Sequence, residues 1–204
     1  MKRWNGLLSL VSSLSLVAAC VTSEVPPVGR TGALPLTADE RRIWKQAGEE
    51  RFALDRSGRV YDNAEVTGYV NRIAARVVPA EAQGKGLSLQ IKILKNPLLN
   101  AFAYPDGVVY MHTGILARMD NEAQLAALFA HEMTHVTHRH TVQQYQEFKN
   151  SADFLATLQV VGAPFGIFGG LVGLLGTVGA MASVSGYSRE LETEADREGL
   201  ERMA

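Results

Sequence analysis

The sequence predicts a mainly helical α+β domain in which a small sheet lies next to a helix with the pattern His-Glu-x-x-His. Three observations lead to this prediction. Apolar residues recur at three- and four-residue steps in several stretches, which is typical of amphipathic helices. Residues 87–93 instead alternate between apolar and polar side chains, which is typical of a half-buried strand. His131 and His135 stand four residues apart in a stretch of helical periodicity, so both lie on one face of that helix.

Length and composition bound the class of protein. A chain of 204 residues with 47% hydrophobic residues can bury one good core. The formal net charge is −1, and the sequence lacks the basic bias of proteins that bind nucleic acid. Cys20 is the only cysteine, so no internal disulfide can form.

The N-terminus resembles a bacterial export signal. Lys2 and Arg3 precede an apolar run that ends at Ala19 and is too short for a spanning helix. Residues 16–20, Leu-Val-Ala-Ala-Cys, resemble the lipobox of bacterial lipoproteins, which implies that Cys20 is lipidated. The alternative is an ordinary cleaved signal in which Cys20 is an incidental thiol.

These features divide the chain into three parts. The stretch before the first predicted helix has three prolines and no periodicity, so we expect a tether. We therefore expect a periplasmic protein of the bacterial cell envelope, lipid-anchored to a membrane, with the outer membrane favoured. The expected parts are a signal peptide at 1–19, a lipidated tether at 20–36 and a catalytic domain at 37–204.

Two helices are expected at the start of the domain. Thr37 and Glu40 have the spacing of a capping box, which begins a charged helix over about 37–54. A second helix is expected over about 63–78, with Pro79 ending it. Both helices are expected to be scaffold.

A change of period then predicts a small sheet. Strands are expected at 87–93, 100–104 and 108–111. Between the last two strands, Pro105-Asp106-Gly107 combines a fixed φ, a side-chain acceptor and a residue that tolerates positive φ, which predicts a turn. The sheet therefore directly precedes the helix that carries the histidines.

The motif His131-Glu132-Met133-Thr134-His135 carries the chemistry. Asp120 or Asn121 can cap its helix, so the motif falls where a helix is predicted independently. The two imidazoles can reach one metal ion while Glu132 faces a water on that ion, which is the arrangement of zinc hydrolases. We expect one Zn²⁺ per chain and Glu132 as the general base. The alternative is a helix with histidines on a solvated face.

The sheet has a functional interpretation beside such a site. A protease holds its substrate extended, and an exposed edge strand does so through backbone hydrogen bonds. The alternative is that these strands only pack the core, because periodicity does not reveal an exposed edge. The candidate substrate-binding residues are Asn100, Ala101, Phe102 and Ala103.

Residues 154–186 contain no charged side chain but eight glycines, and Pro164 divides them. The run is long enough to cross a bilayer, which needs about 20 apolar residues. We favour a helical hairpin beside the active site that touches the membrane surface. A spanning helix and a buried core helix are the alternatives. A single crossing is disfavoured because it would separate the motif helix from the acidic helix that follows.

The third metal ligand is expected downstream, because catalytic zinc usually takes three protein ligands. Residues 188–204 are predicted to be helical. Spacing does not choose among the acids there, because two pairs each share a face of the helix. The candidates are Glu190, Glu192, Glu194, Asp196 and Glu198.

The motif at 131–135, the stretch 187–199 and the preceding stretch 100–107 resemble the zinc metallopeptidase family of the CAAX prenyl protease and the HtpX heat-shock protease. This resemblance implies a zincin-like metallopeptidase domain. In that family the third ligand is the first acid of a Glu-x-x-x-Asp pattern. The resemblance thus implies that Glu192 is a ligand and that Asp196 hydrogen-bonds a ligand histidine.

Within the family, the chain is most similar to the exported bacterial branch that includes the beta-barrel assembly-enhancing protease. Family members continue beyond the position of Ala204, so we expect a domain truncated at its C-terminus. Tyr187 and Arg189 are candidates to stabilise the oxyanion. His112, His138 and His140 are expected to be structural or solvated, with the alternative that one of them reaches the site.

The expected function is that of a zinc-dependent endopeptidase acting on unfolded or extended polypeptides, such as exported or misfolded envelope proteins. The membrane would be reached through Cys20 and the apolar run 154–186. One alternative is a zinc-stabilised, chaperone-like binding module without proteolysis. Another is an integral-membrane protease whose spanning helix lies at 154–186.

Overall fold

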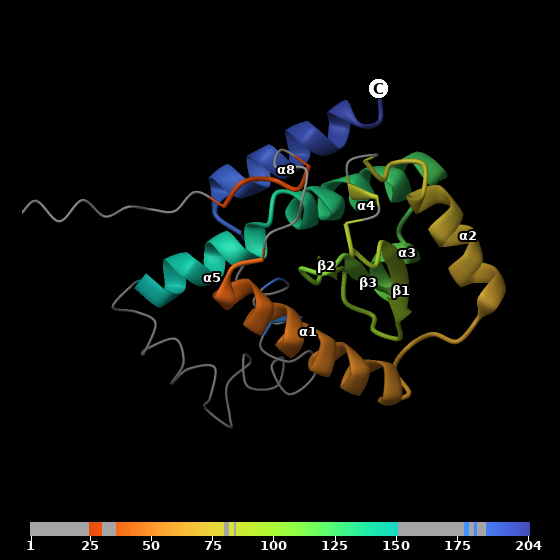
Figure 1. Cartoon of the computed structure of the whole chain (residues 1–204). Helices are drawn as coiled ribbons and strands as arrows, with labels where there is room; N and C mark the ends of the chain where they lie inside the picture. Colours follow the sequence, from red (N-terminus) through yellow and green to blue (C-terminus); the bar gives the residue numbers. More distant parts are fainter. Residues whose placement is uncertain are drawn as a thin grey trace, which may run out of the picture.

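The computed structural model describes residues 25–29, 36–79, 82–83, 85–150, 178–179, 182 and 187–204. The predicted signal peptide at 1–19 and Cys20 lie outside these residues, as does the apolar run 154–186 apart from three positions. The described part is mainly helical with one small sheet, so the predicted α+β class is confirmed (Figure 1). No helix among the described residues has both the length and the hydropathy that a membrane crossing requires.

The predicted elements are present with shifted boundaries. The helices are α1 (Ala38–Arg56), α2 (Ala64–Ala74), α3 (Thr113–Leu116), α4 (Glu122–Thr137), α5 (His140–Asn150) and α8 (Arg189–Glu201). The strands are β1 (Gln90–Leu94), β2 (Ala101–Ala103) and β3 (Val108–His112).

Local sequence explains where α1 begins but not where α2 ends. The predicted capping box at the start of α1 is complete, because Thr37 and Glu40 each accept a backbone hydrogen bond from the other. Helix α2 ends before Pro79, at Ala74. The next residues form tight turns, in which the N–H of Val77 donates to the carbonyl of Ala74. The prediction that proline ends α2 was therefore wrong by about one turn.

The sheet has the order β1-β3-β2, with β1 parallel and β2 antiparallel to the central β3. Strand β1 begins three residues later than predicted, because the N–H of Ser88 donates to the carbonyl of Asp106 in the turn. Gly107 in this turn has φ 97°, as its predicted role requires. Because β3 is the central strand, β2 is an outer strand of the sheet.

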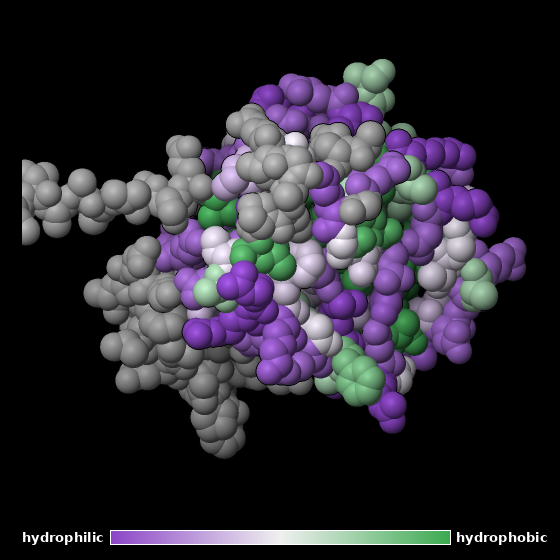
Figure 2. Space-filling view, viewed as in Figure 1, coloured by the Kyte–Doolittle hydropathy of each residue, from purple (hydrophilic) through white to green (hydrophobic). Residues whose placement is uncertain are grey.

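Apolar side chains alternate between the two faces of the sheet. Val109 and Met111 of β3 face a core with α2 and α4, whereas Val108 and Tyr110 face a second core with α1. In Figure 1 the sheet accordingly lies between α1 and α4, and α8 runs along α4 on the side away from the sheet. The visible surface is mostly hydrophilic, with scattered apolar residues (Figure 2).

A buried ion pair joins α1 to the end of α4. The guanidinium of Arg139 donates to Glu40, and both side chains are almost completely buried. Arg139 is the one described non-glycine residue with positive φ, at 61°. This left-handed residue lies between α4 and α5, close behind the motif helix.

Candidate metal centre

Helix α4 places both motif histidines at one point. It begins at Asn121, whose side chain accepts a hydrogen bond from the backbone of Gln124. About three turns later, His131 and His135 stand one turn apart with their Nε2 atoms separated by 3.0 Å. Two ligand atoms of the same type therefore meet on the side of α4 that faces α8.

Helix α8 brings a carboxylate to the same point. Glu192 lies with Oε2 3.3 Å from Nε2 of His131 and with Oε1 3.8 Å from Nε2 of His135. The backbone N–H of Tyr187 donates to Glu192 Oε1 at 3.3 Å and so orients the carboxylate. Of the acids that spacing left open, Glu192 is the one that meets both motif histidines.

Close packing of α8 on α4 fixes this arrangement. Ala195 is fully buried, and a Cβ added at Gly199 would lie 3.1 Å from the backbone nitrogen of His131. Arg202 follows α8 and donates to the carbonyl of Ala130 and to the hydroxyl of Thr134. The small residues permit the close approach, and the arginine ties the C-terminal end of α8 to α4.

The three residues fit a divalent metal ion. His131, His135 and Glu192 offer ligand atoms that all lie within 4.8 Å of one another. Two imidazoles and one carboxylate match a catalytic zinc site, which keeps a fourth position for water. The pKa of His135 is lowered to about 2, chiefly by burial and further by nearby histidines, and the neutral imidazole is the form that binds metal.

Asp196 lies behind the first histidine. Its Oδ1 is 2.9 Å from Nδ1 of His131, on the side of the ring opposite the candidate ligand atom. The N–H group at Nδ1 of His131 donates to the carboxylate of Asp196, which leaves the lone pair on Nε2 for a metal.

Glu132 is buried beside this cluster. Burial raises its pKa to about 8, and the neighbouring Glu192 carboxylate contributes to the rise. Without a metal the carboxyl group therefore holds a proton near neutral pH, and a positive charge nearby would favour its release.

Comparison with known proteins identifies the family. The model of peptidase family M48 matches residues 64–204, which is more than half of the chain. The chain belongs to peptidase family M48. The metallopeptidase family predicted from the sequence is thereby confirmed, and membership implies a bound metal ion.

The relatives are longer than this chain. The beta-barrel assembly-enhancing protease of Yersinia pestis is 33% identical over 148 residues, which are 70% of this chain and 30% of that protein. That of Escherichia coli K12 is 32% identical, over 67% of this chain and 28% of its own length. The mitochondrial metalloendopeptidase OMA1 of Schizosaccharomyces pombe is 31% identical, with 67% and 38% covered. The chain thus spans less than two fifths of the length of these relatives.

His140 and Tyr187, whose roles the sequence left open, both contact the second motif histidine. His140 lies with Nδ1 2.8 Å from Nδ1 of His135. Tyr187 stacks on the His135 ring at 3.9 Å and bonds through its hydroxyl to Thr141. Periodicity could not have revealed His140, because the left-handed Arg139 breaks the helix before it.

The predicted substrate-binding residues lie on the outer strand of the sheet. Asn100 accepts a hydrogen bond from the backbone of His112, and the next three residues form β2. The side chains of Phe102 and Ala103 are buried in the two cores, so this strand packs the interior. Its backbone pairs with β3 alone among the described strands, which makes it an edge strand beside α4.

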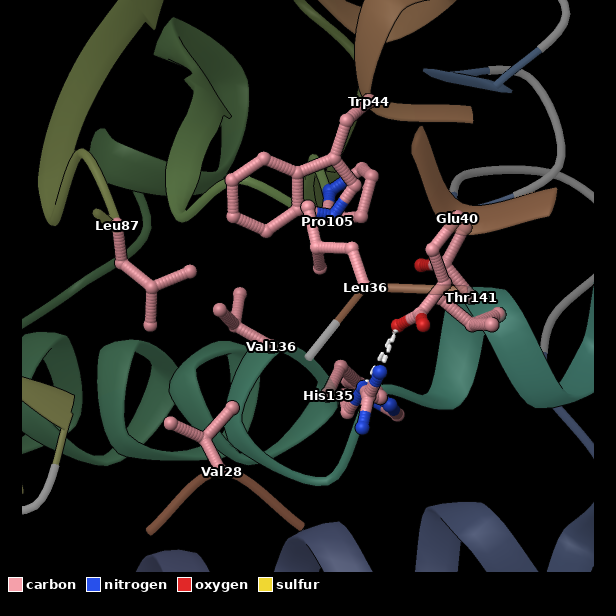
Figure 3. Close-up of a pocket in the computed structure, with 11 residues that line it drawn as sticks. Val28, Leu36, Glu40, Trp44, Leu87, Pro105, His135, Val136 and Thr141 are labelled. Carbon is pink, nitrogen blue, oxygen red and sulfur yellow. Dashed lines mark hydrogen bonds and ion pairs between the residues drawn. The ribbon is translucent and has the colours of Figure 1, made fainter. Parts of the chain in front are cut away.

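A small cavity lies on the α1 side of the motif helix (Figure 3). Figure 3 shows Trp44 and Leu36 above Val136 and His135. At one side of the cavity lies the ion pair between Glu40 and Arg139. The cavity has a volume of about 10 Å³, which is room for about one water molecule. It is too small to receive a substrate side chain.

Proposed function

We propose that this M48 chain is a zinc-dependent endopeptidase with one Zn²⁺ held by His131, His135 and Glu192. The observation that carries the proposal is the meeting of two histidines from α4 with one carboxylate from α8, with ligand atoms within 4.8 Å. A glutamate directly follows the first histidine, as peptide hydrolysis by this class of site requires.

The chemistry divides among few groups. When bound, zinc polarises the scissile carbonyl and lowers the pKa of a water towards about 7. Glu132 takes a proton from the attacking water and delivers it to the leaving amine, a role typically worth about 10²- to 10⁴-fold in rate. Asp196 accepts a hydrogen bond from Nδ1 of His131 and keeps that ring in the tautomer with a free Nε2.

The edge strand β2 offers a place for the substrate. A polypeptide that adds to the side of β2 away from β3 pairs through backbone hydrogen bonds, which hold that polypeptide extended regardless of its sequence. Asn100, Ala101, Phe102 and Ala103 contribute main-chain groups in this proposal, because the last two side chains are buried. The strand contacts α4, so a substrate bound there would lie beside the helix that carries both motif histidines.

The substrates we propose are exported or misfolded proteins of the bacterial envelope. The names of the relatives from Yersinia pestis and Escherichia coli support this proposal. Lipidation of Cys20 after removal of 1–19 would anchor the protein on the periplasmic side of a membrane, with the outer membrane favoured. The tether 20–36, the domain 37–204 and contact of the run 154–186 with the membrane are parts of the same proposal.

The decisive experiment compares two glutamates of α4. Glu132→Gln should keep zinc and lose hydrolysis of an unfolded polypeptide such as reduced casein. Glu122→Gln, an equal change at the exposed N-terminal end of the helix, should keep both zinc and hydrolysis.

Retained hydrolysis in Glu132→Gln would remove this residue from the mechanism. Zinc binding by the full-length parent without cleavage of any unfolded polypeptide would instead favour the chaperone-like module. Fractionation of cells that express Cys20→Ala tests the anchor. Release of this variant from membranes supports a lipid anchor, and resistance to alkaline extraction would favour a spanning helix at 154–186.

A further inference from the structure

The motif histidines differ in what supports them. His131 has a carboxylate directly behind its ring, because Asp196 lies 2.9 Å from its Nδ1. His135 has no carboxylate at that position among the described residues. Its Nδ1 faces Nδ1 of His140 at 2.8 Å. The two candidate ligands on α4 are therefore oriented by different chemical groups.

A carboxylate lies on the far side of the His140 ring from His135. Nε2 of His140 is 3.3 Å from Oε2 of Glu194, which stands two residues before Asp196 on α8. His140 is fully buried, and its Nε2 has no aligned hydrogen-bond partner among the described residues. The side chain of Glu194 is 37% exposed, so it has room to rotate onto this N–H.

We propose that His140 and Glu194 are positioning residues that orient His135 and set its tautomer through a chain of two hydrogen bonds. This inference rests on the proposed function, because the lone pair on Nε2 of His135 has a use only if that atom binds metal. A neutral imidazole has one donor and one acceptor nitrogen, so the proton of His135 has to sit on Nδ1 if its Nε2 is to hold a metal. His135 donates from Nδ1 to Nδ1 of His140, and His140 donates from Nε2 to Glu194.

The reverse arrangement would disable the ligand. If His140 donated from Nδ1, the proton of a neutral His135 would sit on Nε2, where the metal has to bind. The carboxylate of Glu194 disfavours this arrangement, because an ionised carboxylate accepts hydrogen bonds and cannot donate them. Helix α8 would thus support both motif histidines, His131 directly through Asp196 and His135 through His140.

The packing around the ring is consistent with a positioning role. Tyr187 stacks on His135 at 3.9 Å with an interplanar angle of 19°, and its ring meets the edge of His140 at 5.8 Å. The hydroxyl of Tyr187 is held by Thr141, one residue after His140. Both imidazoles are therefore confined in rotation, and the hydrogen bond between them selects the orientation.

Zinc affinity of the purified full-length protein, measured by competition with a chelating dye, tests the proposal. His140→Leu fills the position with an apolar side chain but removes the Nδ1 acceptor for His135. It should weaken zinc binding by about 10- to 100-fold. His140→Asn places an amide oxygen near the position of Nδ1 and should recover part of the loss. His138→Leu is the matched control and should bind zinc like the parent, because His138 lies near Glu194 but makes no hydrogen bond to His135.

A spectroscopic measurement separates positioning from a purely structural role. Long-range ¹H–¹⁵N spectra of the metal-free parent should place the proton of His135 on Nδ1 and that of His140 on Nε2. Glu194→Ala should redistribute the proton of His140, whereas Glu190→Ala on the same helix should not.

Parent-like zinc affinity in a folded His140→Leu, or protons on the opposite nitrogens, would overturn the proposal. If the parent bound no zinc, the proposed function would fail. The tautomers of the metal-free protein would still decide whether the hydrogen-bond chain exists.

Discussion

Replacing Glu40 with glutamine tests the ion pair that joins α1 to the end of the motif helix. Glu40 is 1% exposed and Arg139 is 7% exposed, so water cannot take the place of either partner. The carboxylate accepts from Nε of Arg139 at 2.7 Å and from one of its terminal nitrogens. Glu40→Gln leaves the guanidinium charge buried beside a neutral amide, and removing one partner of such a pair costs about 3–5 kcal/mol.

For a chain of this length that loss corresponds to a fall of about 6–20 °C in Tm. Thermal unfolding followed by circular dichroism measures it. The control is Glu49→Gln on the same helix, where the carboxylate is 68% exposed and 3.8 Å from Lys45. Such a surface pair contributes less than about 1 kcal/mol. A Tm of Glu40→Gln within the range of the control would refute the reasoning.

The double variant Glu40→Met with Arg139→Met separates the effect of a buried unpaired charge from the effect of lost hydrogen bonds. It leaves no charge buried, so it should be more stable than Glu40→Gln. A double variant that is less stable than the single one would show that hydrogen bonds, rather than an unpaired charge, account for the loss.

Three further predictions concern packing, pH and the metal. A methyl group at Gly114 would collide with the backbone of Pro97 and Leu98, so Gly114→Ala should lower the free energy of unfolding in urea by about 1–3 kcal/mol. Gly48→Ala adds a methyl group in open space within a helix and should raise that free energy by about 0.5–1 kcal/mol. Burial lowers the pKa of His112, so the unfolded chain takes up its proton first and stability falls as the pH drops below about 6.5. His112→Phe should reduce that slope by up to about 1.4 kcal/mol per pH unit in urea unfolding of the metal-free protein. Glu192→Gln should weaken zinc binding in a dye-competition assay and Glu190→Gln should not.

The elements that the sequence predicted well have strong local signals. The capping box at Thr37 and the side-chain cap at Asn121 fix the starts of α1 and α4 through hydrogen bonds within a few residues. The motif histidines lie one turn apart for the same local reason, because helix geometry alone sets their spacing. Such features need no knowledge of the rest of the fold.

Boundaries set by tertiary contacts were less predictable. The first residues of the predicted strand 87–93 alternate correctly, but Ser88 bonds to the turn at Asp106 and so leaves the sheet. Helix α2 ends at Ala74 although helical periodicity continues to Val78. In both places a partner distant in sequence or a local turn competes with the pattern, and periodicity carries no information about that competition.

The site shows the same division between local and distant information. Spacing left five acids of α8 open, and only resemblance to a family favoured Glu192. The structure distinguishes them through the packing of Ala195 and Gly199 on α4, which sets the rotation of α8. The sequence named His140 only as one of three histidines of which one could reach the site, because His140 follows the left-handed Arg139, where helical numbering no longer predicts direction.

The central claim is that one zinc ion is held jointly by α4 and α8. A crystal structure of the zinc-loaded, full-length protein, with anomalous data collected at the zinc absorption edge, tests it most directly. Joint binding predicts one strong peak about 2.0–2.2 Å from Nε2 of His131, Nε2 of His135 and a carboxylate oxygen of Glu192. A peak elsewhere, or a metal held by the two histidines with Glu192 turned away and no other acid in its place, would contradict the account.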